Sequence, residues 1–131
     1  MRETNEIEIF FRNLGPCDIP CARLPGMFPS IFKDENIQVD CERGWRALLL
    51  NLLLILKKNN SPLKITRIME HYAILEIWYE GEDDFGEQVI HLAELASGHI
   101  CTMCGKPGRM VDLEGWYVVL CGNAECHPYP R

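Results

Sequence analysis

The longest run of apolar positions in this chain extends from Trp45 to Leu56, with only two polar interruptions. A run of this length predicts a buried core helix, because a segment crossing a bilayer needs about 20 apolar residues. Gly44 precedes the run, and Lys57–Lys58 end it, where lysine charges complement the C-terminal end of a helix dipole. The pattern therefore predicts one long helix in the middle of the core.

Shorter patterns predict the other elements. Residues 6–12 alternate between polar and apolar side chains and predict a first strand, while residues 63–69 and 74–79 predict a β-hairpin. Residues 85–97 carry apolar side chains at helical spacing, and Gly98 ends that helix. These elements predict an α+β fold with a small antiparallel sheet and two main helices.

Two cysteine pairs near the C-terminus indicate a metal site. Cys101 and Cys104 form a C-x-x-C pair, and Cys121 and Cys126 form a wider second pair. Such pairs on the two arms of a hairpin hold a structural Zn²⁺ ion, so these four cysteines are the predicted zinc ligands. His127 is adjacent to Cys126 and is an alternative fourth ligand, although thiolate is the better ligand for zinc. Four protein ligands leave no open coordination position, which predicts a structural rather than a catalytic ion.

The residues between the two cysteine pairs predict the hairpin itself. Residues 109–112 and 116–120 are strand-like, and Glu114–Gly115 suits the turn between them. We therefore expect a core domain of residues 1–98 and a C-terminal zinc-ribbon hairpin of residues 99–131, packed on the core domain or appended to it.

The remaining cysteines and the first residues bear on the cellular compartment. Seven cysteines are an odd number, and two pairs have metal-ligand spacing, which favours a reducing cytoplasm over secretion. The start, residues 1–6, is charged and lacks the apolar run of a signal peptide. Cys17, Cys21 and Cys41 have no obvious fourth partner, so we expect unligated thiols rather than a second metal site.

Charge is distributed unevenly along the chain, whose net charge is −6. Residues 68–105 contain eight carboxylates and no lysine or arginine. Such a surface repels nucleic acid and attracts a basic protein, although it can also serve solubility alone. The predicted partner-binding residues lie in this segment: Glu76, Trp78, Glu80, Glu82, Asp83, Asp84 and Glu87.

Known catalytic patterns are absent from the sequence. There is no G-x-S-x-G, no P-loop and no G-x-G-x-x-G, and the spacing of His91 and Glu94 before Cys101 does not match a zinc deaminase. We therefore predict that the protein is not an enzyme. A zinc-ribbon nucleic-acid-binding or regulatory protein is the alternative, since nucleic-acid binding is a common use of zinc ribbons. It would use the basic and aromatic residues of the hairpin segment, which are Lys106, Arg109, Arg131, Trp116, Tyr117 and Tyr129.

Three ordered landmarks resemble those of a family of small bacterial and phage proteins of unassigned activity. Cys41–Trp45 is similar to its C-G-D-G-W helix start, and Met69–Trp78 is loosely similar to its V-K-E-K-F-G-G-L-R-F-Y strand. Cys101–Gly108 and Gly115–Cys121 closely match its C-x-x-C-G-x-P-G and G-W-x-x-x-L-C segments. The resemblance covers roughly residues 40–127 and implies a zinc-ribbon fold in a bacterial cytoplasm.

The chain departs from that family at two places. Ala73–Ile74 replaces the family's pair of glycines, and Cys121-x₄-Cys126-His127 replaces its C-x-x-H ending. The family's fourth ligand therefore cannot be carried over. Small acidic bacterial proteins often serve as immunity proteins, so the sequence predicts a zinc-stabilised protein-binding module that blocks a toxin with a basic surface.

Overall fold

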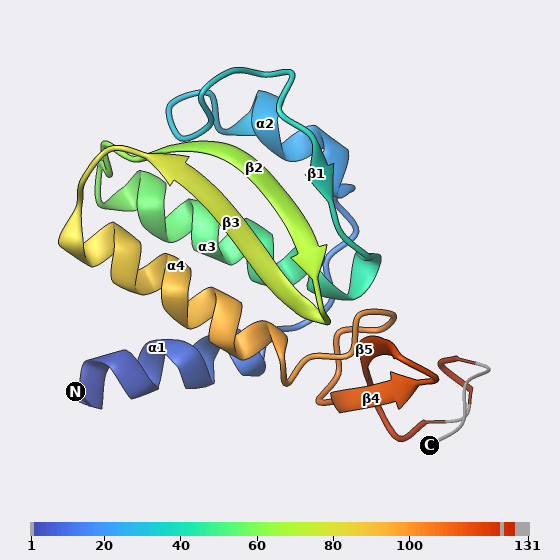
Figure 1. The fold of residues 1–131 in the computed structure, drawn as a ribbon. Helices are drawn as coiled ribbons and strands as arrows, with labels where there is room; N and C mark the ends of the chain where they lie inside the picture. The colour runs from blue at the N-terminus through green and yellow to red at the C-terminus, as the bar shows by residue number, and fades with distance from the viewer. Residues whose placement is uncertain (1, 124, 128–131) are drawn as a thin grey trace.

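Two helices cover one face of a three-stranded sheet, and a C-terminal hairpin lies beside one end of these two layers (Figure 1). The computed structural model describes residues 2–123 and 125–127, and its architecture is α+β. Its helices are α1 (Arg2–Arg12), α2 (Leu24–Met27), α3 (Arg46–Lys58) and α4 (Asp84–Ser97), with 3₁₀ turns η1 (Cys21–Arg23) and η2 (Arg43–Trp45). Its strands are β1 (Val39–Asp40), β2 (Lys64–His71), β3 (Ile74–Glu80), β4 (Arg109–Leu113) and β5 (Trp116–Leu120).

Most of the predicted elements are confirmed. The apolar run forms α3, the second helical pattern forms α4, and the two strand-like pairs form the β2–β3 and β4–β5 hairpins. Gly98 follows the last residue of α4, as expected. The two confirmed helices, α3 and α4, carry long, regular apolar periods, which are the strongest local signal in a sequence.

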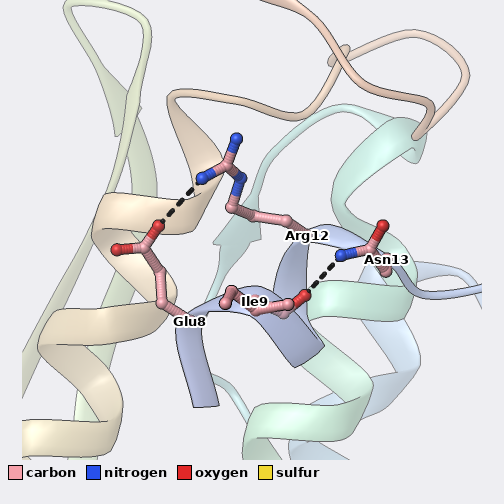
Figure 2. Close-up of polar contacts among 4 residues, drawn as sticks. All are labelled: Glu8, Ile9, Arg12 and Asn13. Carbon is pink, nitrogen blue, oxygen red and sulfur yellow. Dashed lines mark hydrogen bonds and ion pairs between the residues drawn. The ribbon is translucent and has the colours of Figure 1, made fainter. Parts of the chain in front are cut away.

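The predicted strand at residues 6–12 is wrong, because this segment belongs to helix α1. Its apolar side chains also fit helical spacing: Phe11 is fully buried, and Ile7, four residues earlier, packs against the same core. Figure 2 shows how the helix end is held: Arg12 pairs with Glu8 at 3.3 Å, and the Asn13 amide donates a hydrogen bond to the Ile9 carbonyl. The short segment fits both the alternation of a strand and the spacing of a helix. Its contacts with α4 and α3 therefore select the helix.

The sheet is not purely antiparallel, which corrects a second prediction. Its strand order is β1-β2-β3, with β2 and β3 antiparallel and β1 parallel to β2. Strand β1 pairs Val39 with Ile68 and has only two residues, so it carries no period that a sequence pattern could reveal. A parallel bridge between Phe32 and Ile65 continues the same edge. With α1 included, three helices of more than ten residues surround the core instead of the expected two.

The turn between β2 and β3 is tight even though it lacks glycine. Tyr72 and Ala73 form it with φ angles of 51° and 70°. A two-residue hairpin turn requires positive φ at both positions, which is why glycine or asparagine usually occupies them. Ala73 is buried, so the surrounding packing holds a backbone conformation that its side chain disfavours. Tyr72 and Ala73 thus adopt the positive φ angles that a pair of glycines would adopt in this turn.

The core lies between α3, α4, α1 and the inner face of the sheet. Trp45 is fully buried at the start of α3, and the leucines of that helix fill the centre. No helix within residues 2–123 and 125–127 combines the length and apolar character needed to span a membrane. The largest fully buried side chains include Trp45, Phe11, Phe32, Leu24, Ile31, Leu48, Leu49, Leu52, Leu53, Leu56, Leu63 and Ile65.

Strand β3 forms one edge of the sheet, and side chains of α4 accept hydrogen bonds from two of its backbone N–H groups. The backbone N–H of Ile77 donates to the Glu94 carboxylate at 2.9 Å, and that of Leu75 donates to the Ser97 hydroxyl at 2.9 Å. Glu94 and Ser97 are three residues apart, so they lie on one face of α4. This helix therefore blocks the edge where another strand could pair.

Glu94 gives this edge contact a pH dependence. Burial raises the pKa of Glu94 from its ordinary value of 4.5, although the Ile77 N–H opposes the shift. A folded-state pKa above the unfolded value means that this carboxyl contributes less stability as the pH rises above 4.5. We expect Glu94→Gln to keep the hydrogen bond and to gain stability over the wild type from pH 4.5 to 7. Glu94→Ala should lose about 1–2 kcal/mol, because Ile77 then lacks its acceptor.

Urea unfolding at several pH values measures both effects. Glu82→Ala is the matched control, because Glu82 is an exposed carboxylate and makes no hydrogen bond or ion pair with the described residues. Its unfolding curve should follow the wild type at each pH. Parallel pH profiles for the wild type and Glu94→Gln would contradict the assignment.

Candidate functional site

Four cysteine side chains converge between the end of α4 and the β4–β5 hairpin. The sulfurs of Cys101, Cys104, Cys121 and Cys126 all lie within 4.8 Å of one another. The Sγ atoms of Cys101 and Cys126 are 3.7 Å apart, and those of Cys104 and Cys121 are also 3.7 Å apart. A disulfide bond is far shorter, at about 2.05 Å. This arrangement can hold a metal ion, and it is the predicted set of four cysteines.

Tight turns bring the cysteines together. Gly105 follows Cys104 with φ +84°, a conformation that an L side chain rarely adopts. Glu114 and Gly115 form the two-residue turn between β4 and β5, both with positive φ, and β5 returns the chain to Cys121. The backbone N–H of Thr102 donates to the Val119 carbonyl at 3.0 Å, which ties the first cysteine pair to β5.

Backbone N–H groups also surround the sulfur of Cys101. Burial alone would raise the pKa of this thiol, but donors from Met103, Cys104 and Cys121 outweigh it and lower the pKa to about 7. Thiolate is the form that binds metal. The loop after Cys101 is therefore arranged to accept negative charge on the sulfur.

His127 lies outside the cluster. Its ring is buried, and its Nε2 atom is 2.9 Å from the carbonyl oxygen of Cys121. Among the described residues, the group that can hold a metal comprises the four cysteines and does not include this histidine. The side chain supports the chain leaving Cys121 rather than joining the sulfurs.

The start of α3 is bonded to the loop that carries the first cysteine pair, named here the knuckle (residues 100–105). Three consecutive residues of η2 contact it: Arg43 Nε donates to the Met103 carbonyl at 2.9 Å, Gly44 N donates to Thr102 O at 2.7 Å, and Trp45 Nε1 donates to Ile100 O at 3.1 Å. The sequence analysis did not identify these contacts. The sequence feature at these contacts is the Gly44–Trp45 pair before the apolar run.

The three other cysteines do not form a second cluster. The sulfurs of Cys21 and Cys41 are 3.0 Å apart, whereas Cys17 lies along a cleft and joins neither. No third ligand accompanies Cys21 and Cys41 among the residues that the structure describes.

The predicted partner-binding residues divide into two groups. Asp83 accepts a hydrogen bond from Ser61 at 2.7 Å, and Glu87 accepts from the Asp83 N–H and the Tyr79 hydroxyl, both at 3.1 Å. These two acids stabilise the beginning of α4. The other five have exposed or half-buried side chains on β3, the following turn and the first residue of α4; they are Glu76, Trp78, Glu80, Glu82 and Asp84.

Trp78 lies on the face of the sheet opposite α3 and α4. Strand β3 alternates, with Leu75 and Ile77 buried and Ile74 and Trp78 exposed. Figure 1 shows α3 behind the β2–β3 pair and α4 along β3. Since Leu75 and Ile77 belong to the buried core, Trp78 lies on the other face of the strand. The Trp78 side chain is 53% exposed, and its ring nitrogen donates to Glu76 at 2.6 Å.

A cleft of about 660 Å³ lies beside the knuckle. The loop after α1, the beginning of α3 and the knuckle line it, and Asp18 is the carboxylate among the described residues that line it. The alternative nucleic-acid function also included Tyr129 and Arg131, which lie outside the described residues. The cationic side chains lining the cleft are Arg12, Arg43, Arg46 and Lys106.

Comparisons with protein-family models, curated proteins and solved structures find no match to this chain. The resemblance to small bacterial and phage proteins therefore stays a prediction, and the function is argued from the site alone.

Proposed function

We propose that this chain is a zinc-stabilised protein-binding module, an immunity-type protein that blocks a partner toxin by docking it on the outer face of the β2–β3 sheet. The observation that carries the proposal is Trp78. An indole that is 53% exposed on the edge strand of a sheet is a large apolar surface in contact with water. Tryptophan is also the residue type most enriched among residues that dominate binding energy at protein interfaces.

The acidic side chains that favour a basic partner lie along β3 and the turn after it, while Arg67 and Lys64 lie opposite Trp78 and Glu80 on β2. Glu76 and Glu80 are the neighbours of Trp78 on the same face of β3, and Glu82 and Asp84 follow at the end of the strand. An aromatic anchor within a polar rim is the usual arrangement of a protein interface, and rim charges accelerate association with an oppositely charged partner. The exposed Lys33–Glu80 ion pair, at 2.9 Å, is weak enough to be exchanged for a partner's cation.

Zinc is the metal that best fits the four cysteines. Four thiolates at about 2.3 Å from a tetrahedral zinc ion lie about 3.8 Å from one another. The sulfurs of Cys101 and Cys126, and those of Cys104 and Cys121, are each separated by 3.7 Å. With all four positions taken by protein, the ion has no site for substrate and acts as a structural crosslink.

A survival assay tests the proposal. The product of the gene adjacent to this one would be expressed in a sensitive bacterium with the wild type, with Trp78→Ala or with Trp116→Ala. Trp116 is 60% exposed on β5 and is the matched control. We expect the wild type and Trp116→Ala to rescue growth. Trp78→Ala should weaken binding of the purified partner by at least about 30-fold, because truncating such an anchor costs about 2 kcal/mol or more.

Two outcomes of that assay would overturn the proposal. A neighbouring product that does not kill, or killing that the wild-type chain does not relieve, removes the immunity function. Rescue that depends on Trp116 but not on Trp78 removes the sheet face as the docking surface.

The four cationic side chains that line the cleft support nucleic-acid binding as the second candidate function. Four thiolates and one Zn²⁺ carry two net negative charges, however, and Arg43 and Lys106 beside the knuckle offset them. Little positive charge is then left for phosphates on a chain of net charge −6. Retention on heparin that falls with salt and with Lys106→Gln would favour this second function over protein binding.

A further inference from the structure

Cys21 and Cys41 form a second close pair of sulfurs, separate from the proposed metal site. Cys21 begins η1 and Cys41 directly follows β1, so the two residues come from different elements 20 positions apart in the chain. Their Sγ atoms are 3.0 Å apart. A disulfide bond of about 2.05 Å would require the sulfurs to approach by about 1 Å, which side-chain rotation can supply.

The surrounding fold holds both residues in place. Cys21 is 6% exposed and belongs to the main core, and Cys41 is half-buried and packs against that core. Parallel pairing of β1 with β2 fixes the chain immediately before Cys41, and β1 also contacts η1. The close approach therefore follows from the packing of two ordered elements. Since Cys41 is only half-buried, a small reagent has a route to the pair.

The environment favours thiolate at Cys21 only, because the hydrogen bond with Cys21, burial and the nearby charges of Asp40 and Glu42 raise the pKa of the Cys41 thiol. The hydrogen bond from Cys41 lowers the pKa of the Cys21 thiol; burial opposes this, and the charge of Arg46 adds to the lowering. In contrast, no third ligand completes a metal site here among the described residues. The chemistry open to two adjacent thiols without a metal is thiol–disulfide exchange.

We propose that Cys21 and Cys41 are a redox-active dithiol site, oxidised to an intramolecular disulfide by a low-molecular-weight disulfide of the glutathione class. One thiolate of the pair attacks the reagent, forming a mixed disulfide and releasing one molecule of the reduced thiol. The second thiolate then attacks the protein sulfur of that mixed disulfide and releases a second molecule of reduced thiol. Two electrons pass from the protein to the reagent, whose two sulfurs take up the two protons of the pair.

The bond would link η1 to the end of β1. It would close a loop of about 20 residues, which contains α2 and the bridge to Ile65. Crosslinks of this loop length restrict the unfolded chain, so the oxidised protein should melt at a temperature about 10 °C higher than the reduced protein. The site thus makes the stability of the β1 edge depend on redox conditions.

The test treats the full-length, zinc-loaded chain with oxidised glutathione and measures intact mass, disulfide position by peptide mapping, and Tm. We expect a mass loss of about 2 Da, a link between Cys21 and Cys41, and reversal by excess reduced glutathione. Cys17→Ser is the matched control, because Cys17 is a free thiol of the same segment outside the pair, and it should behave like the wild type.

Cys21→Ser and Cys41→Ser should each lose the crosslink and the rise in Tm, and each should stop at a glutathione adduct. If a buried serine destabilises the chain, Cys21→Ala and Cys41→Ala provide the same comparison without a buried hydroxyl. Failure of the wild type to form the crosslink would overturn the proposal, as would a link that involves Cys17. Neither outcome depends on whether Trp78 binds a toxin, so this inference stands apart from the proposed function.

Discussion

Removal of the proposed zinc ion is expected to unfold the segment from Cys101 to Cys126 while leaving much of α3 and α4 folded. The cluster of apolar side chains around the cysteines is small, with Val118 and Leu120 as its buried members besides Cys101 and Cys121. A two-stranded hairpin is marginally stable by itself, so the ion must supply most of the stability of this segment. Structural zinc contributes on the order of 10 kcal/mol in small zinc-binding peptides.

Hydrogen exchange read by mass spectrometry measures this effect directly. Zinc-loaded protein should protect the amides of β4 and β5, and protein treated with a chelator should lose that protection by several orders of magnitude. Amides in the middle of α3 and α4 should remain protected. Zinc content measured alongside should be one ion per chain, and it should fall to zero in Cys101→Ser.

Cys17→Ser is the control for that substitution, because it removes a thiol that lies outside the four-cysteine cluster. It should retain one zinc ion and the full protection of the hairpin. Equal loss of zinc from Cys17→Ser and Cys101→Ser would refute the assignment, and so would a chelated chain whose β4–β5 hairpin stays protected.

The ligand cluster could be predicted because its information is local. A C-x-x-C pair forces both sulfurs toward one centre, and a strongly strand-like segment returns Cys121 to it. The apolar periods of the sequence also predict the β2–β3 hairpin and the helices α3 and α4. The residues that determine each of these features lie within about 20 positions of one another in the sequence.

The features that the sequence analysis missed depend on contacts between distant segments. Residues 6–12 satisfy a strand and a helix pattern, and only the surfaces of α4 and α3 select the helix. The parallel pairing of Val39 with Ile68 has no local signature. The approach of Cys21 to Cys41 likewise appears only once η1 and β1 are placed side by side. Tertiary packing decides each of these cases.

Gly44 joins the two parts of the molecule, and its replacement is expected to have the second large effect. A Cβ atom at this position would lie 2.1 Å from the carbonyl oxygen of Cys101 and 2.4 Å from the carbonyl carbon of Thr102. Both are backbone atoms, which cannot rotate away as a side chain can. The knuckle would have to separate from the core, which would also stretch the bonds that Arg43 and Trp45 make to it.

We therefore expect Gly44→Ala to lose about 3 kcal/mol or more of unfolding free energy, at the upper end of the range for overpacked sites. Urea unfolding of the zinc-loaded protein measures this loss, and competition with a chelator should show weaker zinc retention. Gly26→Ala is the matched control, because nothing lies within 4 Å of its added Cβ. It should stay within about 0.5 kcal/mol of the wild type.

The unfolding free energy and the zinc retention of Gly44→Ala together show whether Gly44 couples the knuckle to the core. If Gly44→Ala loses stability together with zinc affinity, the backbone contact between η2 and the knuckle transmits the stability of the metal site to the buried start of α3. A variant as stable as Gly26→Ala would mean that the knuckle does not lie against Gly44 in solution. In that case the metal site would be a separate appendage, and zinc could not hold the core domain and its Trp78 face in shape.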